Sequence, residues 1–252
     1  MRGSVTQRII MKKTKPRFHH FLLGRLANRL LPSTCALCGQ YHADLLCEPC
    51  QQRYASNASV RCPRCAITLT TQRNACHSCT VRPPSYDASF CATDYAAPID
   101  NLVRALKFNA QLPLAAIFAE RIMGAVPNAA VSNAGLMVAV PLSSQRIAQR
   151  GFNQAHEIAR HIARAWQLPL STAICHRVRD TQPQSSLPVA ERRGNMRGAF
   201  TLMRGHVVRG QHVLVVDDVM TTGETLESFA AMLKRYGAAR VTNLVFARTP
   251  AR

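Results

Sequence analysis

The feature that most constrains this chain is a set of eight cysteines that form four Cys-x-x-Cys pairs. The pairs are Cys35/Cys38, Cys47/Cys50, Cys62/Cys65 and Cys76/Cys79. Two thiolates separated by two residues can both point inward from one tight turn, and two such turns complete the tetrahedral shell of Zn²⁺. Disulfides are rare in a reducing cytoplasm, so regularly spaced pairs favour metal ligation. We predict a small double zinc ribbon that holds two structural zinc ions.

The spacing leaves the pairing of these ligands open. Consecutive pairing gives spacers of 8 and 10 residues within the two ribbons, and a crossed arrangement would give longer ones. We favour consecutive ribbons. The segment has few large apolar residues and can scarcely fold without metal. The two remaining cysteines, Cys91 and Cys175, are expected to be small buried hydrophobes.

The charge of the chain indicates polyanionic partners. Its 252 residues include 32 Lys and Arg against 13 Asp and Glu, which gives a net charge of +19. Such a balance excludes the near-neutral profile of an ordinary metabolic enzyme and favours nucleic acid, phosphorylated ligands or acidic membrane surfaces as partners. A host whose proteins are all basic is the alternative. No apolar run approaches the ~18–20 residues of a membrane span, and we predict a cytoplasmic protein.

Composition shifts predict five regions. Residues 1–17 are expected to be a variable basic extension, with Met11 as a second candidate start, and residues 18–31 an amphipathic helix. The double zinc ribbon occupies residues 32–80. The Pro83-Pro84 pair in residues 81–86 is typical of a linker, because proline is excluded from helix and strand interiors. Residues 87–252 form the larger domain.

The larger domain is predicted to have an α/β fold, with a mostly parallel sheet flanked by helices. Predicted strands span residues 89–96, 136–142, 174–178, 213–216 and 241–247. Predicted helices span residues 99–108, 114–126, 154–166 and 224–236.

The segment Val213–Thr225 carries the strongest functional pattern. Four apolar residues predict a buried central strand, and the acids Asp217 and Asp218 follow where that strand is expected to end. A Thr-Thr-Gly turn then opens a helix, and the backbone N–H groups and positive end of a helix N-terminus bind phosphate. The carboxylates would accept hydrogen bonds from sugar hydroxyls and help to position a hydrated Mg²⁺.

This segment resembles the 5-phosphoribosyl-1-pyrophosphate (PRPP) motif of type I phosphoribosyltransferases. The resemblance implies a type I phosphoribosyltransferase-like fold, with Asp217 and Asp218 on the ribose hydroxyls. It assigns the 5′-phosphate to the loop Met220–Thr225. The PRPP-binding residues that it implies after the acids are Val219, Met220, Thr221, Thr222, Gly223, Glu224 and Thr225.

Two further stretches narrow the resemblance: Val140–Gln154, which contains Arg-Gly-Phe-Asn-Gln, and the basic, glycine-dotted Thr181–Phe200. Together with the cysteine pairs, their order resembles the ComF/GntX-type competence and DNA-utilisation proteins. That family joins a double zinc ribbon to a phosphoribosyltransferase-like domain. The resemblance covers about Leu30 to Arg248.

The family resemblance also implies roles for three arginines. It assigns Leu142–Gln154 to a pyrophosphate loop in which Arg146 and Arg150 grip the diphosphate, since a guanidinium donates two parallel hydrogen bonds to phosphate. Thr181–Arg197 becomes a hood over the site, with Arg192 contacting PRPP. Asp217, Asp218 and Arg150 are the candidate catalytic residues. Lys107 fits the family without an assigned role.

The functional prediction is a PRPP-binding, phosphoribosyltransferase-like protein that serves DNA uptake or the use of DNA as a nutrient. Its expected partners are PRPP with Mg²⁺, single-stranded DNA and proteins of the competence machinery. Two alternatives are a metabolic phosphoribosyltransferase, which transfers the pentosyl group to an acceptor without a DNA role, and a non-catalytic adaptor that senses PRPP.

Overall fold

The computed structural model describes residues 33–54, 59–71, 75–171, 175–177, 200–203 and 205–251. The predicted extension and amphipathic helix, residues 1–31, lie outside the described part, as does the predicted hood with Arg192. The chain divides into two compact units, Met1–Cys47 and Glu48–Arg252. The domain boundaries proposed above stay predictions.

The first unit contains a short antiparallel pair of strands. Strands β1 (Ser33–Thr34) and β2 (Tyr41–His42) are joined by a turn in which Gly39 has a φ of +73°. Glycine adopts this left-handed conformation without the steric cost that a Cβ would bring. The Gly39 amide donates to the carbonyl of Cys35 over 2.8 Å and closes the turn that contains Cys38.

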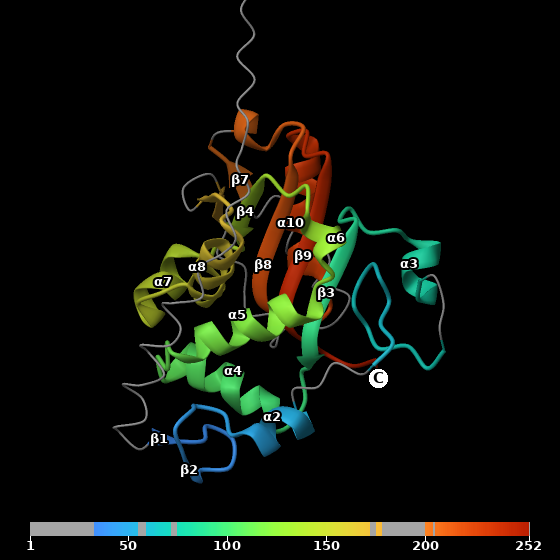
Figure 1. The fold of residues 1–252 in the computed structure, drawn as a ribbon. Helices are drawn as coiled ribbons and strands as arrows, with labels where there is room; N and C mark the ends of the chain where they lie inside the picture. The colour runs from blue at the N-terminus through green and yellow to red at the C-terminus, as the bar shows by residue number, and fades with distance from the viewer. Residues whose placement is uncertain are drawn as a thin grey trace, which may run out of the picture. The chain divides into compact units, whose positions relative to one another are not determined.

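The second unit is built on a parallel sheet of five strands in the order β3-β9-β8-β4-β5 (Figure 1). The strands are β3 (Ala88–Asp94), β4 (Leu136–Ala139), β5 (Leu170–Ser171), β8 (His212–Met220) and β9 (Arg240–Arg248). Every neighbouring pair in this sheet is parallel. The predicted α/β class is therefore confirmed, and β8 with its two acids is the central strand.

Helices cover both faces of the sheet (Figure 1). Helices α5 (Leu114–Ala125) and α8 (Gln154–Trp166) pack on one face, while α10 (Glu224–Arg235) packs on the other. Strand residues alternate between these two cores, as the two-residue period of a strand requires. Phe246, for example, stacks on Phe118 of α5 with ring centroids 3.6 Å apart. Helix α4 (Ile99–Phe108) precedes α5 and packs against it.

The remaining elements are short. They are helices α2 (Glu48–Tyr54), α3 (His77–Val81), α6 (Asn128–Val131) and α7 (Ser144–Arg150), the 3₁₀ helix η2 (Gly205–Val208), and the antiparallel pair β6 (Cys175–Arg177) and β7 (Phe200–Leu202). Within the described residues, no helix combines the length and apolar character needed to cross a membrane.

The structure corrects two details of the predicted fold. Strand β8 runs to Met220 rather than ending at Val216, because its ladder with β9 continues through Asp217 opposite Val245 and Met220 opposite Arg248. The acids therefore belong to the end of the strand and do not follow it. In addition, the predicted pyrophosphate loop contains a helix, α7, which begins where the Ser143 hydroxyl accepts a hydrogen bond from the Arg146 amide.

Candidate functional site

The two acids of β8 lie in different environments. Asp218 is 2% exposed, and its Oδ2 is 2.5 Å from the ammonium of Lys107, at the end of α4. Its Oδ1 accepts a hydrogen bond of 3.3 Å from the side-chain amide of Gln154, the first residue of α8. Asp217 is half-buried and accepts a hydrogen bond from the Asp218 backbone amide. Asp218 is thus enclosed at the end of the strand, whereas Asp217 is partly accessible.

Burial and neighbouring charges shift the pKa values of the two carboxyl groups in opposite directions. Burial alone would raise the pKa of Asp218, but the Lys107 ammonium and the hydrogen bonds from its neighbours outweigh burial and lower it. Burial raises the pKa of Asp217 well above its usual range, and the adjacent Asp218 charge adds to this rise. The Lys107 ammonium thus favours the ionised form of Asp218, and burial beside that charge disfavours ionisation of Asp217.

Helix α7 brings the two predicted arginines toward this pair. The Arg150 guanidinium donates a 2.5 Å hydrogen bond to Oε1 of Gln154, whose amide nitrogen contacts Asp218. Burial lowers the pKa of Arg150, the Asp218 charge opposes this effect, and the positive charge of Arg146 adds to it. Arg150 is thus close enough to interact electrostatically with both Asp218 and Arg146.

An exposed aromatic ring completes this side of the site. Phe108 is 70% exposed, and the Arg150 guanidinium lies 5.4 Å from its ring centroid. Such a separation is typical of a cation–π contact. The dipeptide Lys107-Phe108 therefore supplies one side chain to Asp218 and the other to Arg150.

The loop after β8 turns tightly from the strand into helix α10. Gly223 has a φ of +89°, and a Cβ at this position would lie 2.8 Å from Cε of Met220. Helix α10 begins at Glu224, so its positive end faces the turn. The side chains of Thr221 and Thr222 are exposed, and those of Val219, Glu224 and Thr225 are half-buried. Hydroxyl and backbone donors are thus presented together at the carboxyl end of the sheet.

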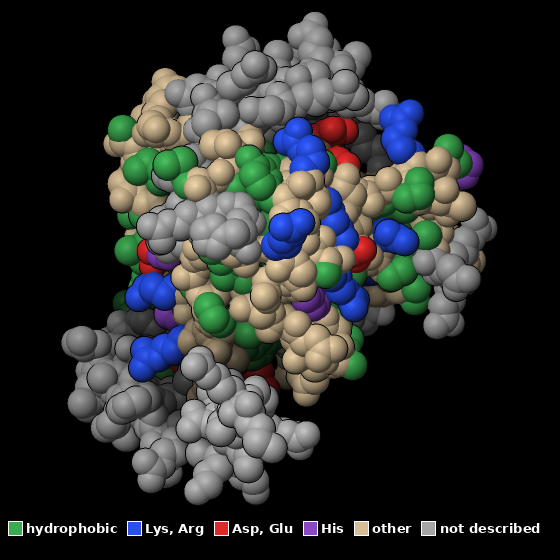
Figure 2. All heavy atoms as spheres, turned by 90° about the horizontal axis from the view of Figure 1, so that it is seen from above, with side chains coloured by type: hydrophobic (Ala, Val, Ile, Leu, Met, Phe, Trp, Pro, Cys, Tyr) green, Lys and Arg blue, Asp and Glu red, His purple; other side chains and the backbone are tan. Residues whose placement is uncertain are grey.

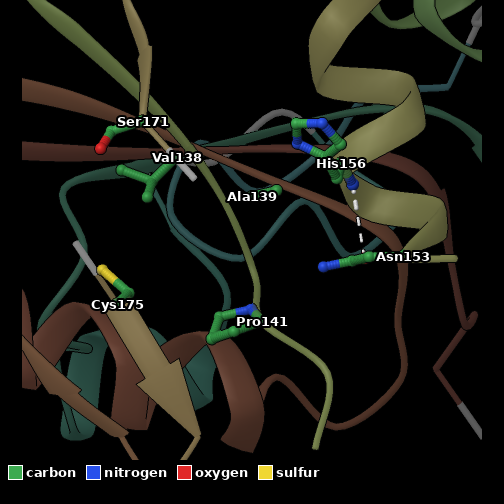
Figure 3. Close-up of a pocket in the computed structure, with 7 residues that line it drawn as sticks. All are labelled: Val138, Ala139, Pro141, Asn153, His156, Ser171 and Cys175. Atoms are coloured by element: carbon green, nitrogen blue, oxygen red, sulfur yellow. Dashed lines mark hydrogen bonds between the residues drawn. The ribbon is translucent and has the colours of Figure 1, made fainter. Parts of the chain in front are cut away.

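A cavity of about 210 Å³ lies at the ends of β4 and β5 and along the start of α8 (Figure 3). Asn153 shapes its rim, because Nδ2 donates to the carbonyl of Val140 while Oδ1 caps α8. Burial raises the pKa of Cys175 to about 12, so this thiol stays protonated at the cavity wall. The lining residues are Val138, Ala139, Pro141, Asn153, His156, Ser171 and Cys175.

The cysteines gather into two groups of four. The Sγ atoms of Cys35, Cys38, Cys47 and Cys50 lie within 4.8 Å of one another, as do those of Cys62, Cys65, Cys76 and Cys79. This consecutive grouping agrees with the ribbons that we favoured from the sequence. Backbone amides point at the sulfurs, with Cys47 N donating to Cys35 Sγ over 3.4 Å and Cys76 N to Cys62 Sγ over 3.3 Å. Four thiols at such separations fit the tetrahedral shell of Zn²⁺.

Backbone hydrogen bonds prepare one thiol of each group as a metal ligand. Burial acts to raise the pKa of Cys35, but the amides around it prevail and lower it to about 6. The same balance lowers the pKa of Cys62. In Cys65 burial prevails and raises the pKa to about 11. A thiolate is the form that binds metal, so these hydrogen bonds favour the metal-binding form of Cys35 and Cys62.

Comparison with known proteins places this geometry in a family. The DNA utilization protein YhgH of Salmonella typhimurium is 33% identical over 227 residues, which cover 87% of this chain and 98% of that protein. The chain belongs to the family of these DNA utilization proteins. Competence protein F of Haemophilus influenzae is 29% identical over 201 residues, or 78% of this chain and 87% of that protein. The predicted membership of the competence and DNA-utilisation family is confirmed.

The phosphoribosyltransferase-like domain of this family member is recognised separately. A model described as the phosphoribosyl transferase domain matches residues 147–252, a range that contains β8, its two acids and the loop after them. Among solved structures, a Bacillus subtilis glutamine PRPP amidotransferase gives a TM-score of 0.34 at 23% identity, over 54% of this chain and 26% of that chain. That structural similarity is too low to carry an argument, and the sequence match carries the domain assignment.

Some residues of this DNA-utilisation protein's site were missed from the sequence. Gln154 joins Arg150 to Asp218, and Phe108 faces Arg150, yet neither was assigned a role. Lys107 was noticed without one. The signal available in the sequence was the pair Lys107-Phe108, a lysine and an aromatic residue at the end of a predicted amphipathic helix. Cys91 and Cys175 are both buried, as predicted.

Proposed function

We propose that this chain binds PRPP at the carboxyl end of β8. Asp217 accepts hydrogen bonds from the ribose hydroxyls, and the loop Met220–Thr225 with the start of α10 binds the 5′-phosphate. The positive φ of Gly223, which lets the backbone turn directly from β8 into α10, supports this assignment most strongly.

The diphosphate is assigned to the basic side of the site. Arg150 and Arg146, at the end and within α7, donate to its oxygens, and Lys107 holds Asp218 in place. In pentosyl transfer a nucleophilic atom of the acceptor donates an electron pair to ribose C1 and bonds to it, while the bond between C1 and the diphosphate oxygen breaks and the diphosphate leaves with its electron pair. Guanidinium groups stabilise the charge that develops on this leaving group.

The carboxylates fit a magnesium ion that arrives with the ligand. Both oxygens of Asp218 are engaged, by Lys107 and Gln154, and one oxygen of Asp217 accepts a backbone hydrogen bond. The protein therefore offers few free oxygens for Mg²⁺, which commonly keeps several waters and binds through substrate phosphates. When bound, the ion neutralises the charge of the diphosphate.

The two cysteine groups are proposed to hold one structural zinc ion each. With the basic surface of the chain, the zinc ribbon would bind single-stranded DNA during DNA uptake or utilisation. The names of the relatives and the net charge of +19 support this part of the proposal. In Figure 2, Lys and Arg side chains are spread across the viewed face, with acidic side chains among them.

Calorimetric titration of the full zinc-loaded chain tests the proposal against its two alternatives. We expect Mg²⁺-dependent binding of PRPP, binding of a single-stranded oligonucleotide, and release of diphosphate when an acceptor is supplied. PRPP binding without DNA binding would indicate a metabolic phosphoribosyltransferase. Binding of both ligands without diphosphate release under any acceptor would indicate a PRPP-sensing adaptor. An absence of PRPP binding would contradict the proposal.

A further inference from the structure

The second cysteine group is built into the sheet of the larger unit. The Ser89 amide of β3 donates to the carbonyl of Pro63, inside the Cys62–Cys65 turn, over 3.1 Å. Arg61, immediately before that turn, forms an ion pair of 2.9 Å with Asp94 at the end of β3. The turn is thus fixed to the edge strand from both sides, and the Cys62–Cys79 group and the sheet share one core.

A single buried arginine connects this group to the candidate phosphate loop. Arg248, the last residue of β9, is 6% exposed. Its Nε donates to the carbonyl of Cys65 over 2.9 Å. Its Nη1 donates to the carbonyl of Met220 over 3.0 Å and also to that of Thr221. One rigid guanidinium therefore holds a residue of the cysteine group and the first two residues of the loop in fixed relation.

The charge of Arg248 makes the link depend on the metal. The ion pairs found in the described part of the chain do not include Arg248. Carbonyl oxygens alone offset only part of the cost of burying a cation. A zinc ion held by four thiolates carries a net negative charge, and Arg248 is bonded to the backbone of one of its ligands. Metal binding thus supplies the missing counter-charge, and metal loss removes it.

The chain that leaves the cysteine group is tied to the same loop by a second contact. Both the backbone amide and the hydroxyl of Ser85 donate to the carboxylate of Glu227, in the first turn of α10, over 2.8 and 2.6 Å. The Tyr86 hydroxyl lies 3.5 Å from the position that a Cβ on Gly223 would occupy. The residues following Cys79 therefore pack against the turn between β8 and α10.

We propose that the second cysteine group, acting through Arg248, sets the backbone conformation of Met220–Thr221, so that zinc in this group controls the affinity of the loop for a phosphoribosyl ligand. Arg248 is a positioning residue, since its guanidinium contacts the loop carbonyls. The ligand part of this inference rests on the proposed function, whereas the coupling between metal and loop does not.

Amide hydrogen exchange of the full chain tests the coupling without any ligand. We expect chelation of zinc to speed exchange in peptides covering residues 219–225 as well as residues 62–79. In Arg248→Met, exchange at residues 219–225 should already be fast and should no longer respond to chelation. Arg240→Met, which removes an exposed arginine at the other end of β9, should behave as the wild type. Wild-type exchange at residues 219–225 that ignores chelation would overturn the inference.

PRPP titration tests the consequence for binding and covers the case in which Arg248→Met does not fold. Cys79→Ser removes one ligand of the second group. Arg248→Lys keeps the positive charge but loses the planar set of N–H donors of the guanidinium. We expect each to weaken PRPP binding by about tenfold or more, the range of losses seen when supporting residues of a site are removed. Wild-type affinity in a Cys79→Ser protein that has lost one zinc would overturn the inference. A wild type that binds no PRPP but still couples exchange to zinc would reject the proposed function alone.

Discussion

Asp218 is the residue around which the candidate site is organised. A carboxylate with 2% exposure is tolerated only when it is paired and hydrogen-bonded, and Lys107 and Gln154 supply both requirements. The same contacts hold α4, α8 and β8 together where the ligand is proposed to bind. Asp218 therefore contributes both to the stability of the fold and to the proposed binding site.

Replacing Lys107 by Met should cost the folded state about 3 kcal/mol, because it strands a buried charge. In the wild type the lowered pKa of Asp218 stabilises the fold above its unfolded pKa of about 3.9, and this contribution is lost as pH falls through the lower folded value. In the variant burial raises that pKa, so the deficit should be largest near neutral pH and shrink on acidification. Urea unfolding at several pH values measures both effects.

Lys234→Met is the matched control for this substitution. Lys234 pairs with Asp87 over 2.7 Å at a half-exposed position, where an ion pair contributes about 1 kcal/mol or less. Equal losses of stability in the two variants would show that Asp218 does not depend on Lys107.

Gly223→Ala should weaken PRPP binding because the left-handed turn costs an alanine roughly 1–2 kcal/mol and its Cβ would press on Met220. Gly124→Ala, at an uncrowded site in α5, should instead leave binding unchanged and raise stability by about 0.5–1 kcal/mol. Titration calorimetry and thermal unfolding of both variants measure this difference. Unchanged PRPP affinity in Gly223→Ala would show that this turn does not bind the 5′-phosphate.

At the scale of elements, the sequence predicted the helices that a local pattern of apolar residues stabilises, and it missed contacts between residues far apart in the chain. Helices at residues 99–108 and 154–166 agree with the structure because each carries an apolar stripe at helical spacing. The length of β8 was underestimated because its last residues are held by hydrogen bonds to β9, which no local pattern displays. The hydrogen bonds of Gln154 and Arg248 join residues 64 and 183 positions apart in sequence, and for the same reason they could not be predicted.

Metal analysis of the reduced, folded chain should find two zinc ions. Cys38→Ser and Cys79→Ser should each lower the content to one, since each removes a ligand from a different group. The double variant Cys91→Ser/Cys175→Ser should retain two ions, because neither thiol belongs to a group. One ion or fewer in the wild type would refute the double ribbon.

At the scale of the whole molecule, a test of DNA binding must separate the effect of positive charge from the effect of disturbing the fold. Removing the cysteine-rich segment would also remove the partners of Arg248, Asp94 and Ser89, so truncation cannot report on DNA binding alone. Surface substitutions avoid this difficulty, since exposed arginines occur both in the second cysteine group and on the helices of the larger domain.

Arg64→Ala with Arg82→Ala, both exposed beside the second cysteine group, should weaken binding of single-stranded DNA. The salt dependence of log K should become shallower by about 0.7 for each phosphate that the variant no longer neutralises. Arg164→Ala with Arg235→Ala removes the same charge from exposed positions on α8 and α10. Equal reductions in affinity in the two double variants, measured by fluorescence anisotropy over a salt series, would indicate diffuse adhesion and not a dedicated surface.

The central claim is that the carboxyl end of β8 binds PRPP, and Asp217→Asn tests it most directly. Asp217 is half-buried and makes no ion pair among the described residues, so the substitution should leave the fold intact. Calorimetry of PRPP with Mg²⁺ should show affinity reduced by about tenfold or more, because the amide of Asn places an N–H donor where the carboxyl has an oxygen, and one ribose hydroxyl then loses its acceptor. Glu120→Gln, an exposed change on α5, should bind as the wild type. Wild-type affinity in Asp217→Asn would contradict the account.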